Sequence, residues 1–137
     1  MPETTGTNTG WTSEEIYMLA DRGYGFYRQG SYQEAVVIFE GLIAIDPANA
    51  YCRSALAAIS MAMGDTHRAV SELSLILSRN PSNHEARARR CEAYCELRSW
   101  KEARQDLAIL RRNGERHQVQ RLTWRLEASG APNKQLP

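Results

Sequence analysis

The side chains in this sequence with the greatest capacity for chemistry are two cysteines, Cys91 and Cys95, and the histidines His84 and His117. Cysteines four residues apart share one face of a helix, where their thiolates could bind a metal ion such as zinc. A structural zinc site needs four ligands, and the two histidines do not complete a set, because His117 falls in a later predicted helix. We therefore predict that Cys91 and Cys95 are buried or groove-lining thiols and that the chain holds no metal.

Catalytic arrangements are also missing from the sequence. No Cys/His or Ser/His pair has a fixed neighbourhood, and no Gly-rich loop could cradle a phosphate group. The acidic pairs fall on the solvated faces of predicted helices. The sequence therefore predicts a protein that is not an enzyme and that uses no cofactor.

Charge is spread unevenly along the 137 residues, although the net charge is only +1. Residues 1–46 carry two basic against seven acidic side chains, whereas residues 84–128 carry eleven basic against seven acidic. Two interpretations are open: solvated helix faces, or a basic C-terminal half that meets an acidic partner surface. Because acidic residues are interleaved with the basic ones, we predict no nucleic-acid partner.

The sequence also indicates a compartment. No apolar run approaches the roughly 18 residues of a membrane-spanning helix, so we expect no membrane insertion. Residues 1–10 lack the basic-then-apolar pattern of a secretory signal. Three cysteines, an odd number, are typical of reduced thiols in a cytoplasm. We predict a cytoplasmic protein.

A period of 34 residues determines the expected fold. Small, apolar and turn residues recur together at this spacing, and each copy has room for two helices joined by a turn. The phrase that covers the turn and the start of the second helix occurs three times, as Gly30–Ala35, Gly64–Ala69 and Arg98–Ala103.

Residue types at the helix ends support the same division. Thr12 and Glu15 have the spacing of a capping box, in which each side chain accepts a hydrogen bond from the other's backbone N–H. Ser31, Ser82 and Ser99 each precede a glutamate at the same spacing, so we expect three further capping boxes.

The turns and the helix contacts follow a matching pattern. Gly30 and Gly64 stand where a chain reversing between helices needs freedom of φ, while the third turn carries Arg98. One small residue per repeat lets the paired helices approach closely; these residues are Ala35, Ala69 and Ala103.

We therefore predict an all-α fold, a right-handed helical solenoid of three helix-turn-helix repeats with a C-terminal capping helix. Val119, Leu122 and Leu126 give that last helix an apolar stripe that covers the exposed edge of the third repeat. The expected boundaries are a tail over 1–11, a domain over 12–128 with repeats at about 16–49, 50–83 and 84–117, a capping helix over 116–128 and a tail over 129–137.

This pattern resembles the tetratricopeptide-repeat (TPR) family over about residues 16–117. The resemblance implies that the protein holds a partner protein in a concave groove formed by the first helix of each repeat. The groove would be aromatic and apolar in two repeats and charged in the third, although single tyrosines could instead belong to the core. The predicted lining consists of Tyr17, Ala20, Tyr24, Tyr27, Tyr51, Ser54, Ala58, Met61, Arg89 and Cys95.

One common TPR role is not expected. TPR co-chaperones that bind the acidic C-termini of heat-shock chaperones use a clamp of lysine, asparagine and arginine side chains. Only one of the matching residues in this sequence fits, and a single cation cannot hold two carboxylates. The matching residues are Ala20, Tyr24, Ala55, Glu85 and Arg89.

The segment from Tyr24 to Leu42 resembles the first repeat of small bacterial type III secretion chaperones. The resemblance implies a bacterial cytoplasmic chaperone that holds an apolar segment of a needle, export-apparatus or translocator subunit and keeps it soluble before export. A co-chaperone is a further expected partner. The second hypothesis is a general scaffold or adaptor that docks proteins through its basic third repeat and capping helix.

Overall fold

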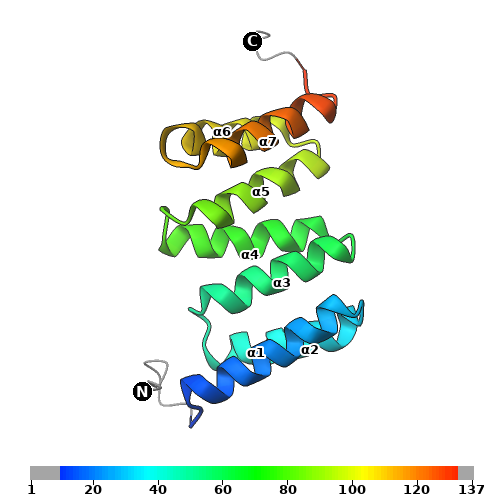
Figure 1. Cartoon of the computed structure of the whole chain (residues 1–137), viewed down its shortest axis with the longest axis vertical. Helices are drawn as coiled ribbons and strands as arrows, with labels where there is room; N and C mark the ends of the chain where they lie inside the picture. Colours follow the sequence, from blue (N-terminus) through cyan, green and yellow to red (C-terminus); the bar gives the residue numbers. More distant parts are fainter. Residues whose placement is uncertain (1–9, 133–137) are drawn as a thin grey trace. The chain divides into compact units, whose positions relative to one another are not determined.

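The computed structural model describes residues 10–132, and every regular element in this part of the chain is an α-helix. None of these helices is both long and apolar enough to cross a membrane. The chain divides into two compact units between Gly64 and Asp65. Unit 1 holds α1 (Ser13–Arg28), α2 (Tyr32–Ile45) and α3 (Ala50–Ala62); unit 2 holds α4 (Thr66–Arg79), α5 (His84–Glu96), α6 (Trp100–Asn113) and α7 (Arg116–Ala128) (Figure 1).

The seven α-helices of the described residues confirm the predicted all-α class. The repeat boundaries at about 16–49, 50–83 and 84–117 remain a prediction. Most of each predicted tail, residues 1–9 and residues 133–137, lies outside the described residues.

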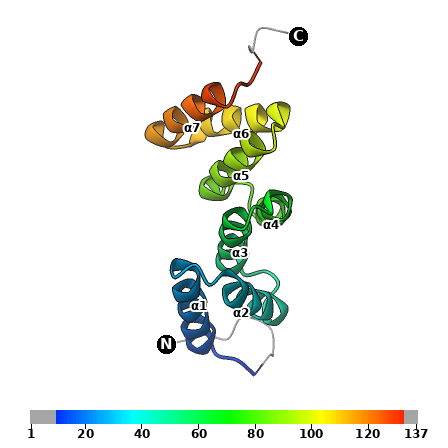
Figure 2. The same ribbon diagram turned by 90° about the vertical axis from the view of Figure 1, so that its right-hand side faces the viewer.

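In unit 1, α1 pairs with α2, and α3 contacts both helices (Figure 2). The pair is close because Gly23 of α1 faces Phe39 of α2. A Cβ atom at Gly23 would lie 2.9 Å from Phe39 Cε2, so no larger residue fits without movement. The core that results is apolar and consists of Ile16, Ala20, Ala35, Val36, Phe39, Leu42, Cys52, Ala55, Leu56 and Ile59.

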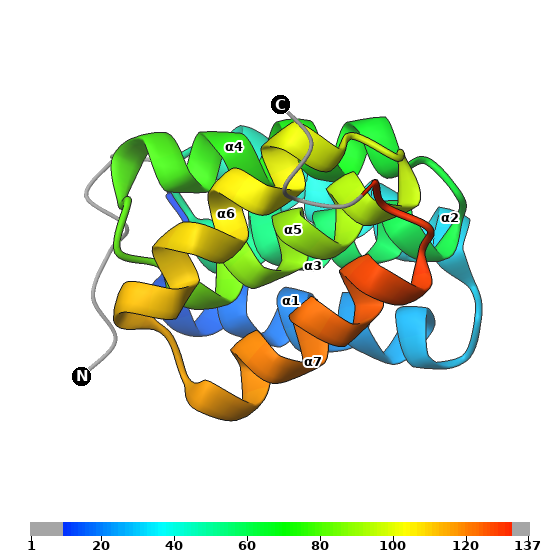
Figure 3. The ribbon, with the colours of Figure 1, turned by 90° about the horizontal axis from the view of Figure 1, so that it is seen from above.

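In unit 2, α5 pairs with α6 and also contacts α4, and α7 lies along both α5 and α6 (Figure 3). Leu122 of α7 is fully buried and Leu126 is nearly so. Helix α7 therefore covers the apolar edge of the last helical pair, which confirms the predicted capping helix. The core of this part of unit 2 consists of Ala88, Cys91, Cys95, Ala103, Leu107, Leu110, Leu122 and Leu126.

The helix starts confirm one expected capping box and contradict three. Thr12 and Glu15 form both hydrogen bonds of the box at α1. Ser31 and Ser99 occupy N-cap positions but make no side-chain cap bond, and Ser82 is not the N-cap of α5, because that residue is Asn83.

Side-chain reach explains the missing caps at Ser31 and Ser99. Asp65 has nearly the same N-cap backbone angles as these serines, yet its carboxylate accepts a hydrogen bond from the Arg68 N–H at 3.3 Å. A carboxylate oxygen lies one bond farther from the backbone than a serine hydroxyl, so only the aspartate spans the gap.

Three of the inter-helix turns, those after α1, α3 and α5, each contain one residue in the same left-handed conformation. Gly30 and Gly64 adopt φ values of 80° and 84°, and Arg98 adopts 58° in the matching turn. A residue with a Cβ atom pays about 1 kcal/mol or more in this left-handed region, whereas glycine does not. The third turn is therefore strained relative to the other two.

Replacing Arg98 by glycine should raise the free energy of unfolding by about 1 kcal/mol, because it removes the strain of the third turn. Urea denaturation followed by circular dichroism measures the change. Arg98→Ala is the matched control, since alanine removes the same exposed side chain but keeps the Cβ atom. An equal gain from both variants would show that the arginine side chain, and not its φ angle, limits stability.

Candidate functional site

A surface of tyrosines lies on α1 and α3 of unit 1. Tyr17 and Tyr24 share one side of α1 because seven residues make about two helical turns, and α3 brings Tyr51 beside them. The rings of Tyr17 and Tyr51 stack with centroids 6.4 Å apart and planes 15° from parallel. Both rings are nevertheless open to solvent, with exposures of 72% for Tyr17 and 51% for Tyr51. We call Tyr17, Tyr24 and Tyr51 the tyrosine surface.

Neighbouring side chains hold Tyr24 in place. Its ring meets Tyr27 edge to face with centroids 5.6 Å apart, and the Arg28 guanidinium lies 5.3 Å from its centroid. Tyr27 in turn contacts Tyr32 at 5.9 Å. Aromatic pairs in these geometries attract one another and lose little entropy on binding a ligand, because the rings are already oriented.

The Tyr51 phenol of the tyrosine surface is neutral at neutral pH. Burial raises the pKa of the Tyr51 phenol above its ordinary value, and the neighbouring phenols of Tyr24 and Tyr17 raise it further. The exposed rings therefore present apolar faces with neutral hydroxyl groups at their edges, a combination that is enriched where proteins contact one another.

The other predicted groove residues differ in accessibility. Ser54, Ala58 and Met61 lie half-buried on α3, and Arg89 is half-buried on α5. Two predicted positions do not reach the surface, because Ala20 belongs to the core of unit 1 and Cys95 to that of unit 2, each with 3% exposure.

Unit 2 contains a charged hollow of about 820 Å³ formed by α5, α7, the last residue of α6 and the two residues that follow it. Ion pairs cross or border it. Arg121 of α7 lies 3.8 Å from Glu92 of α5, and Arg89 lies 3.3 Å from Glu85. The lining residues are His84, Glu85, Ala88, Arg89, Glu92, Asn113, Gly114, Glu115, Gln118 and Arg121.

A buried ion-pair network in unit 2 was not predicted from the sequence. Asp106 of α6 is 2% exposed and accepts hydrogen bonds from Arg87 at 3.2 Å and from Arg90 at 2.7 and 2.9 Å. Arg90 also donates to the Ser74 hydroxyl of α4 at 3.2 Å, and Arg87 to the Pro81 carbonyl oxygen at 2.9 Å. Much of the basic charge of the third repeat therefore binds internal acceptors.

Residues 26–78 match the family model described as "Tetratricopeptide repeat". In this segment the chain resembles TPR proteins. No curated protein sequence matches the chain, but its structure is similar to several solved TPR structures.

The first TPR of Spaghetti (RPAP3), bound to the HSP90 peptide SRMEEVD, is 24% identical, with a TM-score of 0.74 over 86% of this chain and 92% of that one. The type III secretion translocator chaperone SycD of Yersinia enterocolitica is 19% identical, with a TM-score of 0.78 over 88% of this chain and 86% of that one. SycD in complex with a peptide of the translocator YopD is 20% identical, with a TM-score of 0.77 over 86% and 94% of the two chains. These likenesses support a helical-solenoid fold for the chain.

The cysteines of the chain lie inside its two helical units. All three are free and buried. Hydrogen bonding to Cys95 and burial raise the pKa of Cys91, whose thiol also donates to the Ala103 carbonyl oxygen at 3.4 Å. Burial raises the pKa of Cys52 to about 11. Between residues 10 and 132, no three His, Cys, Asp or Glu side chains are grouped closely enough to hold a metal ion.

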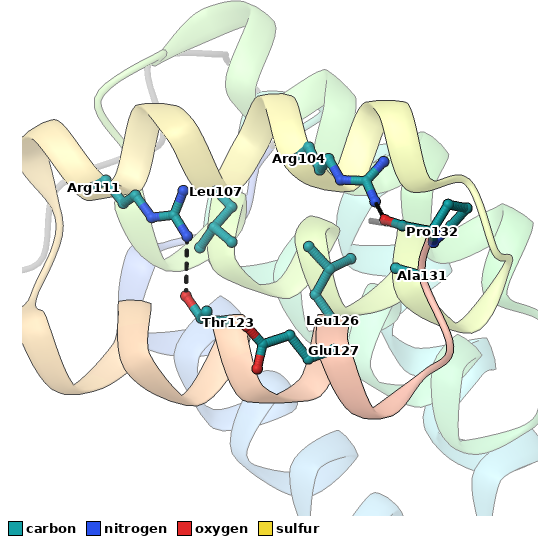
Figure 4. Close-up of a pocket in the computed structure, with 8 residues that line it drawn as sticks. All are labelled: Arg104, Leu107, Arg111, Thr123, Leu126, Glu127, Ala131 and Pro132. Carbon is teal, nitrogen blue, oxygen red and sulfur yellow. Dashed lines mark hydrogen bonds between the residues drawn. The ribbon is translucent and has the colours of Figure 1, made fainter. Parts of the chain in front are cut away.

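The capping helix α7 contacts α6 beside a second hollow, of about 300 Å³, between these two helices. Figure 4 shows Arg104 and Arg111 of α6 reaching across it. Arg104 donates to the Pro132 carbonyl oxygen, and Arg111 to the Thr123 hydroxyl at 3.4 Å. Both arginines thus fasten the C-terminal segment onto α6.

Proposed function

We propose that this protein is a non-enzymatic chaperone that binds an exposed apolar segment of a client protein on its tyrosine surface. The stacked and exposed pair of Tyr17 and Tyr51 carries the proposal. Two large aromatic faces held in one orientation outside the core are costly to leave in water, and covering them with apolar side chains recovers that free energy.

The client class that we propose is a needle, export-apparatus or translocator subunit of a bacterial type III secretion system, held in the cytoplasm before export. Such a subunit carries segments that would self-associate unless they were covered. The likeness to SycD, which has been solved with a peptide of the translocator YopD, supports this class. A co-chaperone is a further partner under this proposal.

The residues at the positions of the carboxylate-binding clamp favour an apolar client over an acidic C-terminal peptide. A structural neighbour binds an HSP90 peptide that ends in Glu-Glu-Val-Asp. In this chain the matching Ala20 and Ala55 are buried alanines without a polar group, and Glu85 would repel a carboxylate. Arg89, the one matching cation, lies 3.3 Å from Glu85.

The adaptor hypothesis has less support. It requires free basic charge on the third repeat and the capping helix. On α7, Arg125 lies 3.3 Å from Glu96 and Arg121 lies 3.8 Å from Glu92, so glutamates of α5 already neutralise both cations. Exposed pairs of this kind exchange partners at little cost, so the adaptor remains an outcome of the test below.

Photo-crosslinking in the bacterial host tests the proposal. With Tyr17 replaced by benzoylphenylalanine, the chain should form an adduct with one protein, and the adduct should map to an apolar segment of a secretion subunit. Adding Tyr51→Ala should reduce its yield. The matched control is the same photo-reactive residue at Trp124, an exposed aromatic position on α7. Adducts that form only at position 124 would favour the adaptor and contradict our proposal.

A further inference from the structure

Helix α7 ends like the first helix of a repeat. Helices α1, α3 and α5 each end in a right-handed residue followed by one with positive φ, and the chain then enters a second helix. Helix α7 ends in the same way at Ser129 and Gly130, whose φ is 84°. Helices α2, α4 and α6 end differently, at residues with ψ between 84° and 177°. Helix α7 therefore begins a further repeat, and no second helix follows it between residues 10 and 132.

The hollow between α6 and α7 lies where that second helix would pack. Aligning α7 with α5 from their N-caps, a shift of 32 residues, places Thr123 at the position of Cys91. Cys91 is fully buried under α6, and its thiol donates to the Ala103 carbonyl oxygen at 3.4 Å. Thr123 is half-buried and lines the hollow of about 300 Å³ (Figure 4). We call this hollow the terminal hollow; its helical lining is Arg104, Leu107 and Arg111 of α6 with Thr123, Leu126 and Glu127 of α7.

Two arginines give the terminal hollow its charge. Arg104 and Arg111 lie three residues before and four residues after Leu107, on one face of α6. Glu127 brings the one acidic group of the lining. In α2 and α4 the residues that match the two arginines are aliphatic: Val36, Ile43, Val70 and Leu77. Only the last repeat therefore carries cations on this face.

Neither arginine has a carboxylate partner among residues 10–132. Arg104 donates to the Pro132 carbonyl oxygen, and Arg111 donates to the Thr123 hydroxyl at 3.4 Å. Guanidinium groups bind carboxylates more strongly than these neutral acceptors, so an incoming carboxylate would displace them. Five other arginines of unit 2 lie 3.8 Å or less from a carboxylate oxygen: Arg87, Arg89, Arg90, Arg121 and Arg125.

We propose that the terminal hollow binds an acidic amphipathic helix of a second protein, which takes the place of the second helix after α7. Arg104 and Arg111 are seven residues apart, about 10 Å along α6. A helix lying along α6 matches them with acidic side chains at positions i and i+7, and places apolar side chains at i+3 and i+4 over Leu107. Residues 133–137 carry one lysine and no acidic side chain, so they do not complement the arginines.

This inference is independent of the client-binding proposal. The terminal hollow belongs to unit 2, whereas the tyrosine surface belongs to unit 1, and the two share no residue. Loss of one binding activity would therefore leave the other unchanged.

Calorimetric titration of the 137-residue chain with a synthetic peptide tests the proposal. The peptide is an alanine-rich helix of about 16 residues, with glutamate at i and i+7 and leucine at i+3 and i+4. It should bind, and a peptide with lysine in place of both glutamates should bind at least about tenfold more weakly. Absence of binding at about 1 mM glutamate peptide, or equal binding of the two peptides, overturns the proposal.

Charge reversal locates the binding site. Arg104→Glu with Arg111→Glu should weaken binding of the glutamate peptide by about tenfold or more and strengthen binding of the lysine peptide, which also shows that the variant is folded. The matched control is Lys101→Glu with Arg112→Glu, which reverses two exposed cations of α6 outside the hollow. It should change both affinities by less than about threefold. Equal losses in the two variants would show that the peptide follows the net charge of α6, and would contradict the proposal.

Two other occupants of the terminal hollow are tested directly. Deletion of residues 133–137 should change the affinity for the glutamate peptide by less than about threefold, whereas a gain of more than about tenfold would make those residues the occupant. Self-association of the chain that is abolished by Arg104→Glu with Arg111→Glu would make a second copy the occupant. Either result would overturn the assignment of the hollow to a partner protein.

Discussion

Replacing Asp106 by alanine should lower the free energy of unfolding by about 3–5 kcal/mol, which is a large part of the stability of a small domain. The carboxylate is 2% exposed and neutralises Arg87 and Arg90 together. Without it, two guanidinium groups remain in a buried site, where Arg90 still donates to Ser74 and Arg87 to the Pro81 carbonyl oxygen. The loss comes mainly from the uncompensated cations and not from the lost attraction itself.

Urea denaturation followed by circular dichroism measures this loss. The matched control is Glu92→Ala, which breaks an ion pair with Arg121 on the exposed side of α5 and should cost less than about 1 kcal/mol. A small effect at Asp106, equal to that of the control, would show that water reaches the network and screens its charges.

A second variant separates charge from packing at this site. Asp106→Asn keeps the size of the side chain and one acceptor oxygen but removes the negative charge. If the uncompensated charge of Arg87 and Arg90 causes most of the loss, Asp106→Asn should lower the free energy of unfolding nearly as much as Asp106→Ala. If the loss comes mainly from the empty space, Asp106→Asn should lower it clearly less. In the native protein, the hydrogen bonds to Asp106 raise the pKa of Arg90. Arginine side chains keep their proton in proteins, so the buried positive charge persists when the carboxylate is removed.

The fold could be predicted from the sequence because the period of 34 residues fixes packing and turns together. The small residues Ala35, Ala69 and Ala103 are all fully buried, and Gly30 and Gly64 adopt the positive φ values that their turns need. The helix caps were harder to predict. Whether a side chain caps a helix depends on whether its oxygen reaches the backbone N–H group, and one bond length decides this. The serine–glutamate spacing in the sequence does not encode that reach.

The tyrosine surface was partly predictable. Helical spacing placed Tyr17 and Tyr24 on one side of α1. The 34-residue period placed Tyr51 on the first helix of the second repeat. Helical spacing could not show that Ala20 is buried, because the burial of a residue on a helix face depends on the helices that pack around it. Ala20 lies in the core formed by α1, α2 and α3.

The network at Asp106 was missed because a single aspartate in an amphipathic helix is typical of a solvated face. The repeat contained a signal that could have found it. Asp106 occupies the position of Ile38 in the first repeat, and Arg87 occupies that of Leu19. Opposite charges at two positions that are apolar in the first repeat predict a buried ion pair between α5 and α6.

The final prediction concerns the client. Tyr17→Ala combined with Tyr51→Ala should weaken binding of the crosslinked client segment by roughly a thousandfold, because a central aromatic anchor is worth about 2 kcal/mol or more. The two effects should not be independent. The rings stack at 6.4 Å and hold each other in the binding orientation, so either single change should cost more than half of the double loss.

Calorimetric titration of the three variants with the client segment gives these affinities, and circular dichroism confirms that the helices are intact. The matched control is Arg121→Glu with Arg125→Glu, which reverses two exposed charges on α7 and should change the affinity by less than about threefold. The adaptor hypothesis predicts the opposite result: a large loss of affinity in the arginine variant and a small one in the tyrosine variants. Loss of binding in the arginine variant with full affinity in the tyrosine variants would move the binding site from α1 and α3 to the capping helix.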